Sequence, residues 1–161
     1  MIKKTILSLS LLASLLNADM FLKGNKSFGL VLGSGTSYGD NYTIFGLSGD
    51  YFISDNISLG AGYRGWFGSG PNINQLTVAG SYYIPLSEKF HPYVGVFMRE
   101  TMPDGEDNYE SYGARAGLAM STSANSYISF GYAYEQYSSC TNIKKQECSN
   151  SYPELVFSLS F

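Results

Sequence analysis

The sequence contains three arginines, and each of them lies in a segment that is otherwise rich in glycine and in apolar or aromatic residues. Segments of the same kind contain acidic residues, three of which share the sequence parity of the arginines within their segments. Guanidinium and carboxylate groups in such surroundings can pair with each other, line a path for ions, or take part in acid–base chemistry. The six candidates are Asp50, Arg64, Arg99, Arg115, Glu135 and Glu154.

Nucleophilic catalysis is restricted by the presence of a single histidine, His91. A serine or threonine nucleophile needs a base beside it. The sequence KFHPYVG places His91 directly before Pro92, where we expect a turn residue and not a catalytic base. We therefore predict that the protein is not an enzyme and that it has no catalytic residue.

Metal and cofactor binding also lack a specific signal. The segment DGEDNYE, residues 104–110, gathers four carboxylates that suit calcium or magnesium, but their spacing is not that of an EF-hand loop. The segment GSGTSYG, residues 33–39, is rich in glycine, but no helix pattern follows it to complete a phosphate-binding loop. We expect a solvated acidic loop and a mobile outer loop at these two places, and neither a metal nor a cofactor.

Eight segments in which apolar residues alternate with small or polar ones position the charged candidates. An apolar residue at every second position is typical of a β-strand. The segments have the length that a tilted strand needs to cross a bilayer, ~9–11 residues, whereas strands of soluble proteins more often have ~5–6. They cover residues 27–34, 42–53, 57–67, 73–85, 92–101, 109–120, 126–137 and 151–161.

Each segment has one apolar face and one face of small or polar residues, as the last segment, SYPELVFSLSF, illustrates. Its apolar face carries Leu155, Phe157, Leu159 and Phe161, and its other face carries Glu154, Ser158 and Ser160. All six charged candidates fall on the small, polar face of their segments. Such faces fit either a soluble β-sandwich with the apolar faces inside, or a membrane barrel with the apolar faces towards lipid.

The charged residues favour the barrel. Lysine is absent from all eight segments, whereas the solvent face of a sandwich usually carries many lysines and glutamates. Lys or Arg on the lipid face at mid-bilayer costs ~2–4 kcal/mol, so a barrel must turn its arginines inwards, where each needs a partner. We predict an all-β, eight-stranded antiparallel up-and-down transmembrane β-barrel, whose lumen charge network consists of the six candidates.

The function of that network has two interpretations. The interior of an eight-stranded barrel is just wide enough to be filled by side chains. We favour a salt-bridged polar network that fills the lumen, and the alternative is the gate of a narrow small-solute or ion channel. We expect Arg64, Arg99, Glu135 and Glu154 in the half of the lumen away from the two chain termini, Arg115 near the middle, and Asp50 in the half near the termini.

The first eighteen residues resemble a secretory signal peptide. Two lysines precede an uncharged apolar run, and Ala18 provides a small residue for cleavage. We predict a signal peptide at 1–18 and a single barrel domain at 19–161, which retains eight of the 10 Lys and Arg residues against 13 acidic ones. This acidic balance argues against a nucleic-acid partner. Export to an oxidising compartment also predicts a disulfide between Cys140 and Cys148.

The terminal LVFSLSF and the hairpin GLSGDYFISDNISLGAGYRGWF, residues 46–67, resemble the small outer-membrane β-barrel proteins of Gram-negative bacteria: the OmpX-like, NspA-like and OmpA N-terminal-barrel-like proteins. The resemblance implies a bacterial outer-membrane location, membrane lipid and lipopolysaccharide as surroundings, and a monomer. It also implies that Phe157, Leu159 and Phe161 are an assembly signal for the barrel assembly machinery.

The same resemblance implies a topology and a role. Both termini would lie in the periplasm, and the segments 35–41, 68–72, 102–108 and 138–151 would face outwards. The role would be structural or would depend on binding of a surface ligand through the outer loops. A lipid-modifying outer-membrane enzyme is a further alternative, which the absence of a histidine at the outer end disfavours.

Aromatic residues are expected to form two belts at the membrane interfaces. Tyr51, Tyr82 and Phe161 would mark the inner belt. The outer belt would contain Tyr42, Phe67, Tyr112 and Tyr134. Trp66 falls on the inward face near the outer rim, and the sequence gives it no role.

Overall fold

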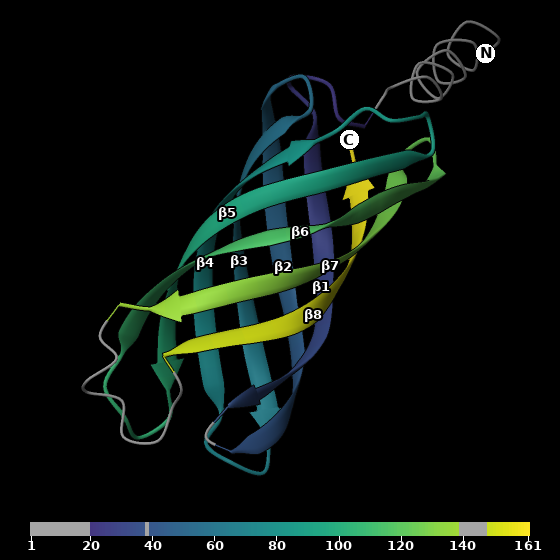
Figure 1. Cartoon of the computed structure of the whole chain (residues 1–161). Coiled ribbons are helices and arrows are strands. Elements are labelled where there is room, and N and C mark those ends of the chain that lie inside the picture. The colour runs from purple at the N-terminus through teal and green to yellow at the C-terminus, as the bar shows by residue number, and fades with distance from the viewer. Residues whose placement is uncertain (1–19, 38, 139–147) are drawn as a thin grey trace, which may run out of the picture.

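The structure is a computed structural model and describes residues 20–37, 39–138 and 148–161. Eight antiparallel strands of 11 to 15 residues form a closed barrel (Figure 1). The strands are β1 (Lys26–Ser37), β2 (Asp40–Ser54), β3 (Ile57–Gly68), β4 (Ile73–Tyr83), β5 (Phe90–Pro103), β6 (Tyr109–Ser123), β7 (Ser126–Tyr137) and β8 (Ser149–Ser160).

Each strand pairs with its neighbours in sequence, and β1 pairs with β8 to close the sheet. The predicted all-β, eight-stranded antiparallel up-and-down barrel is confirmed. In the described part of the chain, no helix has the length and apolar character to cross a membrane. The predicted signal peptide at 1–18 lies outside the described residues and stays a prediction.

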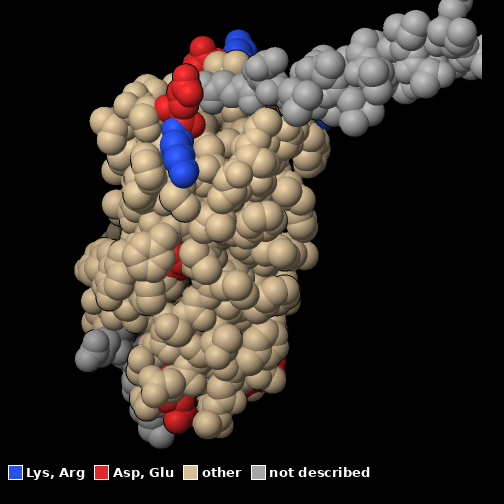
Figure 2. Space-filling view, turned by 90° about the vertical axis from the view of Figure 1, so that its right-hand side faces the viewer, with Lys and Arg blue, Asp and Glu red and all other residues tan. Residues whose placement is uncertain are grey.

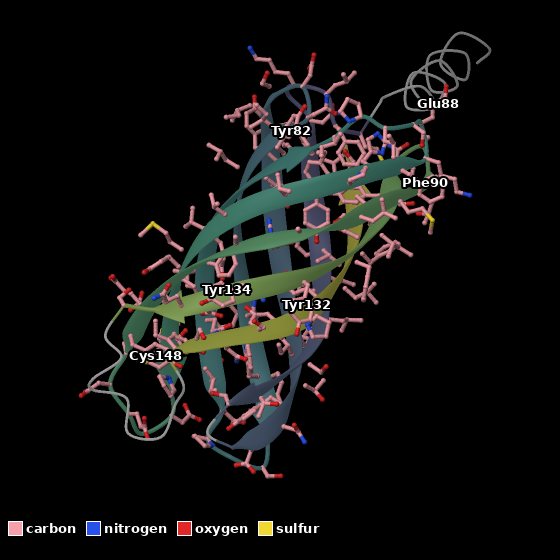
Figure 3. The ribbon with its side chains drawn as sticks, viewed as in Figure 1. Tyr82, Glu88, Phe90, Tyr132, Tyr134 and Cys148 are labelled. Carbon is pink, nitrogen blue, oxygen red and sulfur yellow. The ribbon has the colours of Figure 1, made fainter. Side chains whose placement is uncertain are left out.

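The two ends of the barrel differ. Met20 and Phe161 lie at one end, here called the terminal end, together with the short connections around Asn56, 84–89 and 124–125 (Figure 1). The other end, here called the loop end, lies where β1, β3, β5 and β7 end and β2, β4, β6 and β8 begin, and its described connections include 69–72 and 104–108. Cys148 is at the loop end and Glu88 at the terminal end (Figure 3).

The first predicted outer loop, 35–41, is mostly strand, which corrects the expectation of a mobile segment there. β1 continues to Ser37 and β2 begins at Asp40, and these two residues are paired in register. Only residues 38–39 connect the strands, and Gly39 has a φ of +82°. A positive φ suits glycine and allows a tight connection, so the glycine-rich composition reflects turn geometry and close packing, not a loop.

The barrel is buried on its inner side and exposed on its outer side, with strict alternation along most strands, as β1 and β7 show. Buried apolar side chains inside the barrel form two clusters, one towards each end. The loop-end cluster contains Tyr42, Ile44, Trp66, Ile73, Ala79, Phe97, Ala133 and Tyr152. The terminal cluster contains Met20, Phe21, Phe52, Tyr83, Tyr93, Ala119 and Tyr127.

Candidate functional site: the barrel interior and its apolar belt

The outer wall of the barrel is a continuous apolar belt. Val96 and Phe130, in the middle of the wall, have 66% and 63% of their surface exposed. On the face that Figure 2 shows, charged side chains gather at the two ends and leave the wall between them almost uncharged. Tyr132 and Tyr134 belong to this outer wall on β7 (Figure 3). An exposed apolar surface of this extent is unfavourable in water, whereas hydrocarbon is its appropriate solvent.

The best-connected polar group inside the barrel is Arg99 of β5. Its Nη1 lies 2.6 Å from Oε2 of Glu135 on β7, and both side chains are almost completely buried, with exposures of 1% and 0%. Its Nε donates to Oγ1 of Thr77 over 2.8 Å, and its guanidinium stacks on the ring of Phe97, with 4.4 Å between Cζ and the ring centroid. Charge, hydrogen bonding and stacking therefore hold this side chain in one place.

The carboxylate of Glu135 is satisfied from several strands. Ser111 of β6 donates to Oε1, and the hydroxyl of Tyr152 on β8 donates to Oε2 over 3.1 Å. Tyr152 also contacts Arg99 directly. A buried ion pair stabilises a fold only when the remaining donors and acceptors are satisfied, and this arrangement meets that requirement.

A second ion pair lies close by. Arg64 of β3 contacts Glu154 of β8, and both side chains are buried. The pair needs space inside the barrel, which Gly46 of β2 provides. A Cβ atom at position 46 would come within 2.6 Å of Cβ of Arg64.

Trp66, for which no role was predicted, joins the loop-end cluster through its indole N–H. Nε1 donates to Oε1 of Gln75 over 2.8 Å, and Nε2 of Gln75 donates to Oγ1 of Thr101 over 3.2 Å. The Trp66 ring also meets Tyr152 edge to face at 5.3 Å between centroids. Trp66 therefore fills part of the lumen towards the loop end.

Tyr42 lies inside the barrel, which corrects its assignment to the outer aromatic belt. Only 3% of its surface is exposed. Its hydroxyl donates to the carbonyl oxygen of Pro71, and its ring meets Trp66 edge to face. Its position in β2 has the inward parity. The prediction relied instead on the residue type, because tyrosines near strand ends are common at membrane interfaces.

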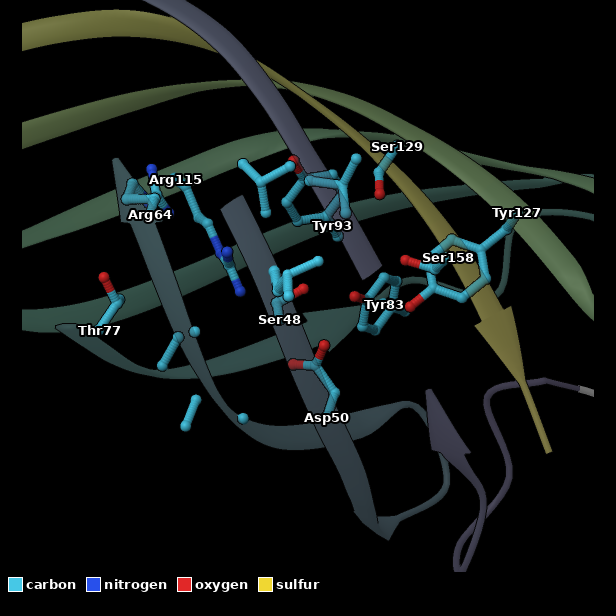
Figure 4. A pocket seen from close by; sticks show the side chains of 17 residues that line it. Ser48, Asp50, Arg64, Thr77, Tyr83, Tyr93, Arg115, Tyr127, Ser129 and Ser158 are labelled. Atoms are coloured by element: carbon cyan, nitrogen blue, oxygen red, sulfur yellow. The ribbon is translucent and has the colours of Figure 1, made fainter. Parts of the chain in front are cut away.

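The middle of the lumen contains a cavity of about 40 Å³, here called the chamber (Figure 4). This volume has room for about three water molecules. Arg115 of β6 and Asp50 of β2 line it, and Nη2 of Arg115 donates to Oγ of Ser81 over 2.9 Å. Among the described residues, no carboxylate lies within ion-pair distance of Arg115, and its Nε has no hydrogen-bond partner. The two residues therefore face the chamber without forming a direct pair.

The six predicted lumen residues thus occupy two different situations. Four of them form two buried pairs in the half of the lumen towards the loop end. Asp50 and Arg115 line the chamber, with Asp50 nearer the terminal end. Thr77, Ser111 and Tyr152 complete the Arg99–Glu135 pair. Their positions on the inward face of their strands were the signal that could have identified them.

The predicted turn position of His91 is wrong. It is the second residue of β5, not a turn residue, and its side chain is 5% exposed inside the barrel. Its ring lies 4.3 Å from that of Phe21 in the terminal cluster. Pro92 follows it in the strand and has the outward parity of Phe90 and Val94, so the segment predicted to be a turn is part of β5.

The predicted assembly-signal residues end β8. Phe157 and Leu159 point outwards, and Phe161 follows the strand with 69% of its surface exposed. The backbone of Phe161 exchanges two hydrogen bonds with Lys26 of β1, over 2.9 and 3.0 Å. The end of the chain therefore closes the barrel seam.

Two other predictions concern the loop end. Cys140 lies outside the described residues, so the disulfide with Cys148 stays a prediction. The acidic segment 104–108 connects β5 and β6 as a loop. In the described ranges, no group of three or more His, Cys, Asp or Glu residues is arranged to hold a metal ion.

No protein-family model and no curated protein sequence matches the chain. Solved structures do match. The N-terminal β-barrel domain of OprF from Pseudomonas aeruginosa gives a TM-score of 0.66 at 13% identity, covering 86% of this chain and 98% of that one. Neisserial surface protein A gives 0.66 at 13% identity, covering 85% and 96%.

The outer membrane enzyme PagL also matches, with a TM-score of 0.53 at 13% identity over 83% of this chain and 98% of PagL. Proteins of different function therefore share this architecture, and at such identities the likeness concerns the fold alone. By its fold, the chain is a small eight-stranded barrel of the kind found among bacterial outer-membrane proteins.

Proposed function

We propose that the protein is an integral outer-membrane β-barrel with a structural or surface-binding role, and that an ion-paired polar network fills its lumen. One observation carries the proposal: apolar side chains form the outer wall, while Arg64 and Arg99 are paired with glutamates inside. This distribution is the inverse of a water-soluble domain and suits a hydrocarbon solvent.

The proposed location is tested by fractionation and gel migration. We expect the protein in the outer-membrane fraction of a Gram-negative host, resistant to extraction by alkali. We also expect an unboiled sample to migrate differently from a boiled one in detergent, because a closed barrel has no free edge at which the detergent can begin to unfold it. A protein that is recovered in the soluble fraction and migrates identically before and after boiling would contradict the proposal.

We propose that Phe157, Leu159 and Phe161 serve as the signal for the barrel assembly machinery. The outward positions of these side chains at the seam support this, because they are accessible to another protein while the barrel is still open. Phe161→Ser should reduce the folded fraction in the membrane much more than Phe130→Ser, which removes an outward phenylalanine from β7 instead. Equal folded fractions for both variants would show that the C-terminal position has no special role.

Surface binding is assigned to the loop end. The proposed periplasmic position of both termini turns the connections 69–72, 104–108 and 138–148 outwards. Replacing 104–108 by a glycine–serine linker of the same length should weaken adhesion of expressing cells to host or envelope components and leave the barrel folded. We propose that a Cys140–Cys148 disulfide restrains the last loop, and Cys140→Ser/Cys148→Ser should reduce adhesion in the same assay. Unchanged adhesion in both variants would leave the purely structural role.

A narrow channel is the second candidate, and Arg115 is the observation that favours it. Arg115 lines the polar cavity, as Arg64 does. Unlike Arg64 and Arg99, it forms no ion pair with a carboxylate among the described residues. In planar bilayers, the unmodified barrel should show no steady conductance if the lumen is closed. A conductance that Arg115→Ala changes in size or selectivity would favour the channel instead.

We further propose that the protein is not an enzyme. The matched PagL structure belongs to an outer-membrane enzyme, but an activity depends on a site and not on a fold. Here His91, the single histidine of the chain, lies inside the barrel at the terminal end. Release of fatty acid from lipid A or phospholipid by the purified barrel would contradict this proposal.

A further inference from the structure

The segment that precedes β1 enters the mouth of the barrel. Phe21 has only 1% of its surface exposed. Its ring lies 4.3 Å from that of His91, 4.7 Å from Tyr83, 5.2 Å from Tyr127 and 5.8 Å from Phe52, measured between centroids. These four residues come from four different strands and point into the barrel. Phe21 therefore lies between them and fills the space that they enclose.

Backbone hydrogen bonds hold this segment against the turn between β2 and β3. The carbonyl oxygen of Phe21 accepts from the amide of Asn56 over 2.6 Å. Two residues later, the amide of Lys23 donates to Oδ1 of Asp55 over 2.9 Å, and the amide of Gly24 donates to the carbonyl oxygen of Phe52 over 2.8 Å. The segment is therefore fixed by bonds of its own and does not depend on burial of one ring.

Phe21 and the chamber lie on opposite sides of the same two tyrosines. Tyr83 and Tyr127 contact Phe21 on one side and line the chamber on the other (Figure 4). Arg64 of one ion pair lines the chamber, and the Arg99–Glu135 pair and Trp66 lie further towards the loop end. Phe21 thus packs against the aromatic wall of the chamber on the side of the terminal end.

We propose that Met20 and Phe21 form a plug that closes the terminal end of the lumen and separates the chamber of Asp50 and Arg115 from the solvent at that end. The strands alone leave this end lined by aromatic side chains, and the plug is supplied by residues outside the sheet. This closure is independent of the location and role proposed above, because it concerns only which residues seal the lumen.

The plug is tested by the accessibility of a thiol in the chamber. Ser48, which lines the chamber, is replaced by cysteine in a chain whose two native cysteines are replaced by serine. The purified barrel is then treated with the small uncharged reagent methyl methanethiosulfonate. We expect Phe21→Ala to increase the labelling rate about tenfold or more, because the barrier to local opening is removed.

Phe28→Ala is the matched control, since Phe28 is a phenylalanine of the same end of the barrel that points outwards. It should leave the labelling rate unchanged. Equal labelling rates in the parent barrel and in Phe21→Ala, or equal acceleration by Phe28→Ala, would overturn the proposal. Unboiled gel migration identifies the folded fraction that is compared.

A second measurement uses His91, whose ring resonances are unambiguous because the chain contains one histidine. In the parent barrel, the Phe21 ring at 4.3 Å should shift the imidazole proton resonances away from those of a solvent-exposed histidine. Phe21→Leu keeps an apolar side chain and the fold but has no ring current, so the resonances should move. Resonances that stay unchanged in Phe21→Leu would overturn the plug independently of the labelling result.

Discussion

At the scale of single residues, the charged side chains of the lumen differ in whether they have a partner of opposite charge. Arg64 and Arg99 are paired with glutamates, whereas Asp50 and Arg115 line the chamber without a direct ion pair in the described part of the chain. Arg99 and Glu135 have their hydrogen-bonding capacity met by Thr77, Ser111 and Tyr152. Such a network raises stability little compared with an apolar core of equal volume, but it is strongly destabilising when one partner is removed. This asymmetry makes the pair a sensitive test of whether the interior is dry.

Arg99→Met should lower the free energy of unfolding by about 3–5 kcal/mol, because it leaves Glu135 buried without its counter-charge. Adding Glu135→Met should recover a large part of that loss, since the double variant has no uncompensated charge. Urea unfolding of the barrel in detergent or lipid vesicles measures both values. A loss of less than about 1 kcal/mol for Arg99→Met, typical of a solvent-exposed pair, would mean that water reaches the network.

The identity of the paired residues was not available from the sequence. Parity alone places all six charged residues on inward faces, and that inference needs only the period of a strand. Which arginine pairs with which glutamate depends on how far non-adjacent strands, such as β5 and β7, are shifted relative to each other along the barrel. No local sequence pattern encodes this shift. The inward position of Tyr42 was missed because tyrosine is enriched at membrane interfaces and its parity was not used. That of His91 was missed because the predicted strand began at Pro92.

At the scale of the strands, the alternation predicts the position of each element, but it does not predict the residues at which the element begins and ends. The middle of every strand was predicted, because an uninterrupted period of two leaves no other assignment. The ends of β1 and β2 extend beyond the prediction, up to Ser37 and Asp40, because glycine and serine near a tight connection resemble a loop in composition. Glycines on the inward face provide space for long side chains from the opposite strands.

Gly46 and Gly49 of β2 form a matched pair for testing this. A Cβ at Gly46 would lie 2.5 Å from the carbonyl oxygen of Tyr63 and 2.6 Å from Cβ of Arg64, whereas the nearest atom to a Cβ at Gly49 is 3.8 Å away. Gly46→Ala should therefore reduce the unfolding free energy by about 1–3 kcal/mol through overpacking. Gly49→Ala, on the outer face, should leave it nearly unchanged in the same urea titration. Equal effects would contradict the packing of Arg64 against β2.

At the scale of the whole molecule, the barrel places three layers along its axis. The ion pairs and Trp66 fill the half towards the loop end, the chamber of Asp50 and Arg115 lies in the middle, and Phe21 fills the terminal end. The closure of β1 on β8 makes these layers continuous, because no open edge remains in the sheet. This arrangement requires that the charged side chains are enclosed within the barrel and that the apolar belt contacts hydrocarbon.

The contribution of Phe21 to the terminal layer had no sequence signal. The residue precedes the first alternating segment, and a short apolar stretch before a strand carries no period. Its burial is a consequence of the closed barrel, whose end is wide enough to admit one ring. Contacts of this kind are visible only when the strands have been placed in space.

The single tryptophan of the chain gives the most direct test of the central claim. The barrel is reconstituted in vesicles of brominated phosphatidylcholine, whose acyl chains quench tryptophan fluorescence on contact, and compared with Trp66→Phe/Phe130→Trp. Trp66, 2% exposed and inside the barrel, should keep most of its emission, while a tryptophan at position 130, in the middle of the belt, should be strongly quenched. Strong quenching of Trp66 with little quenching at position 130 would contradict the account.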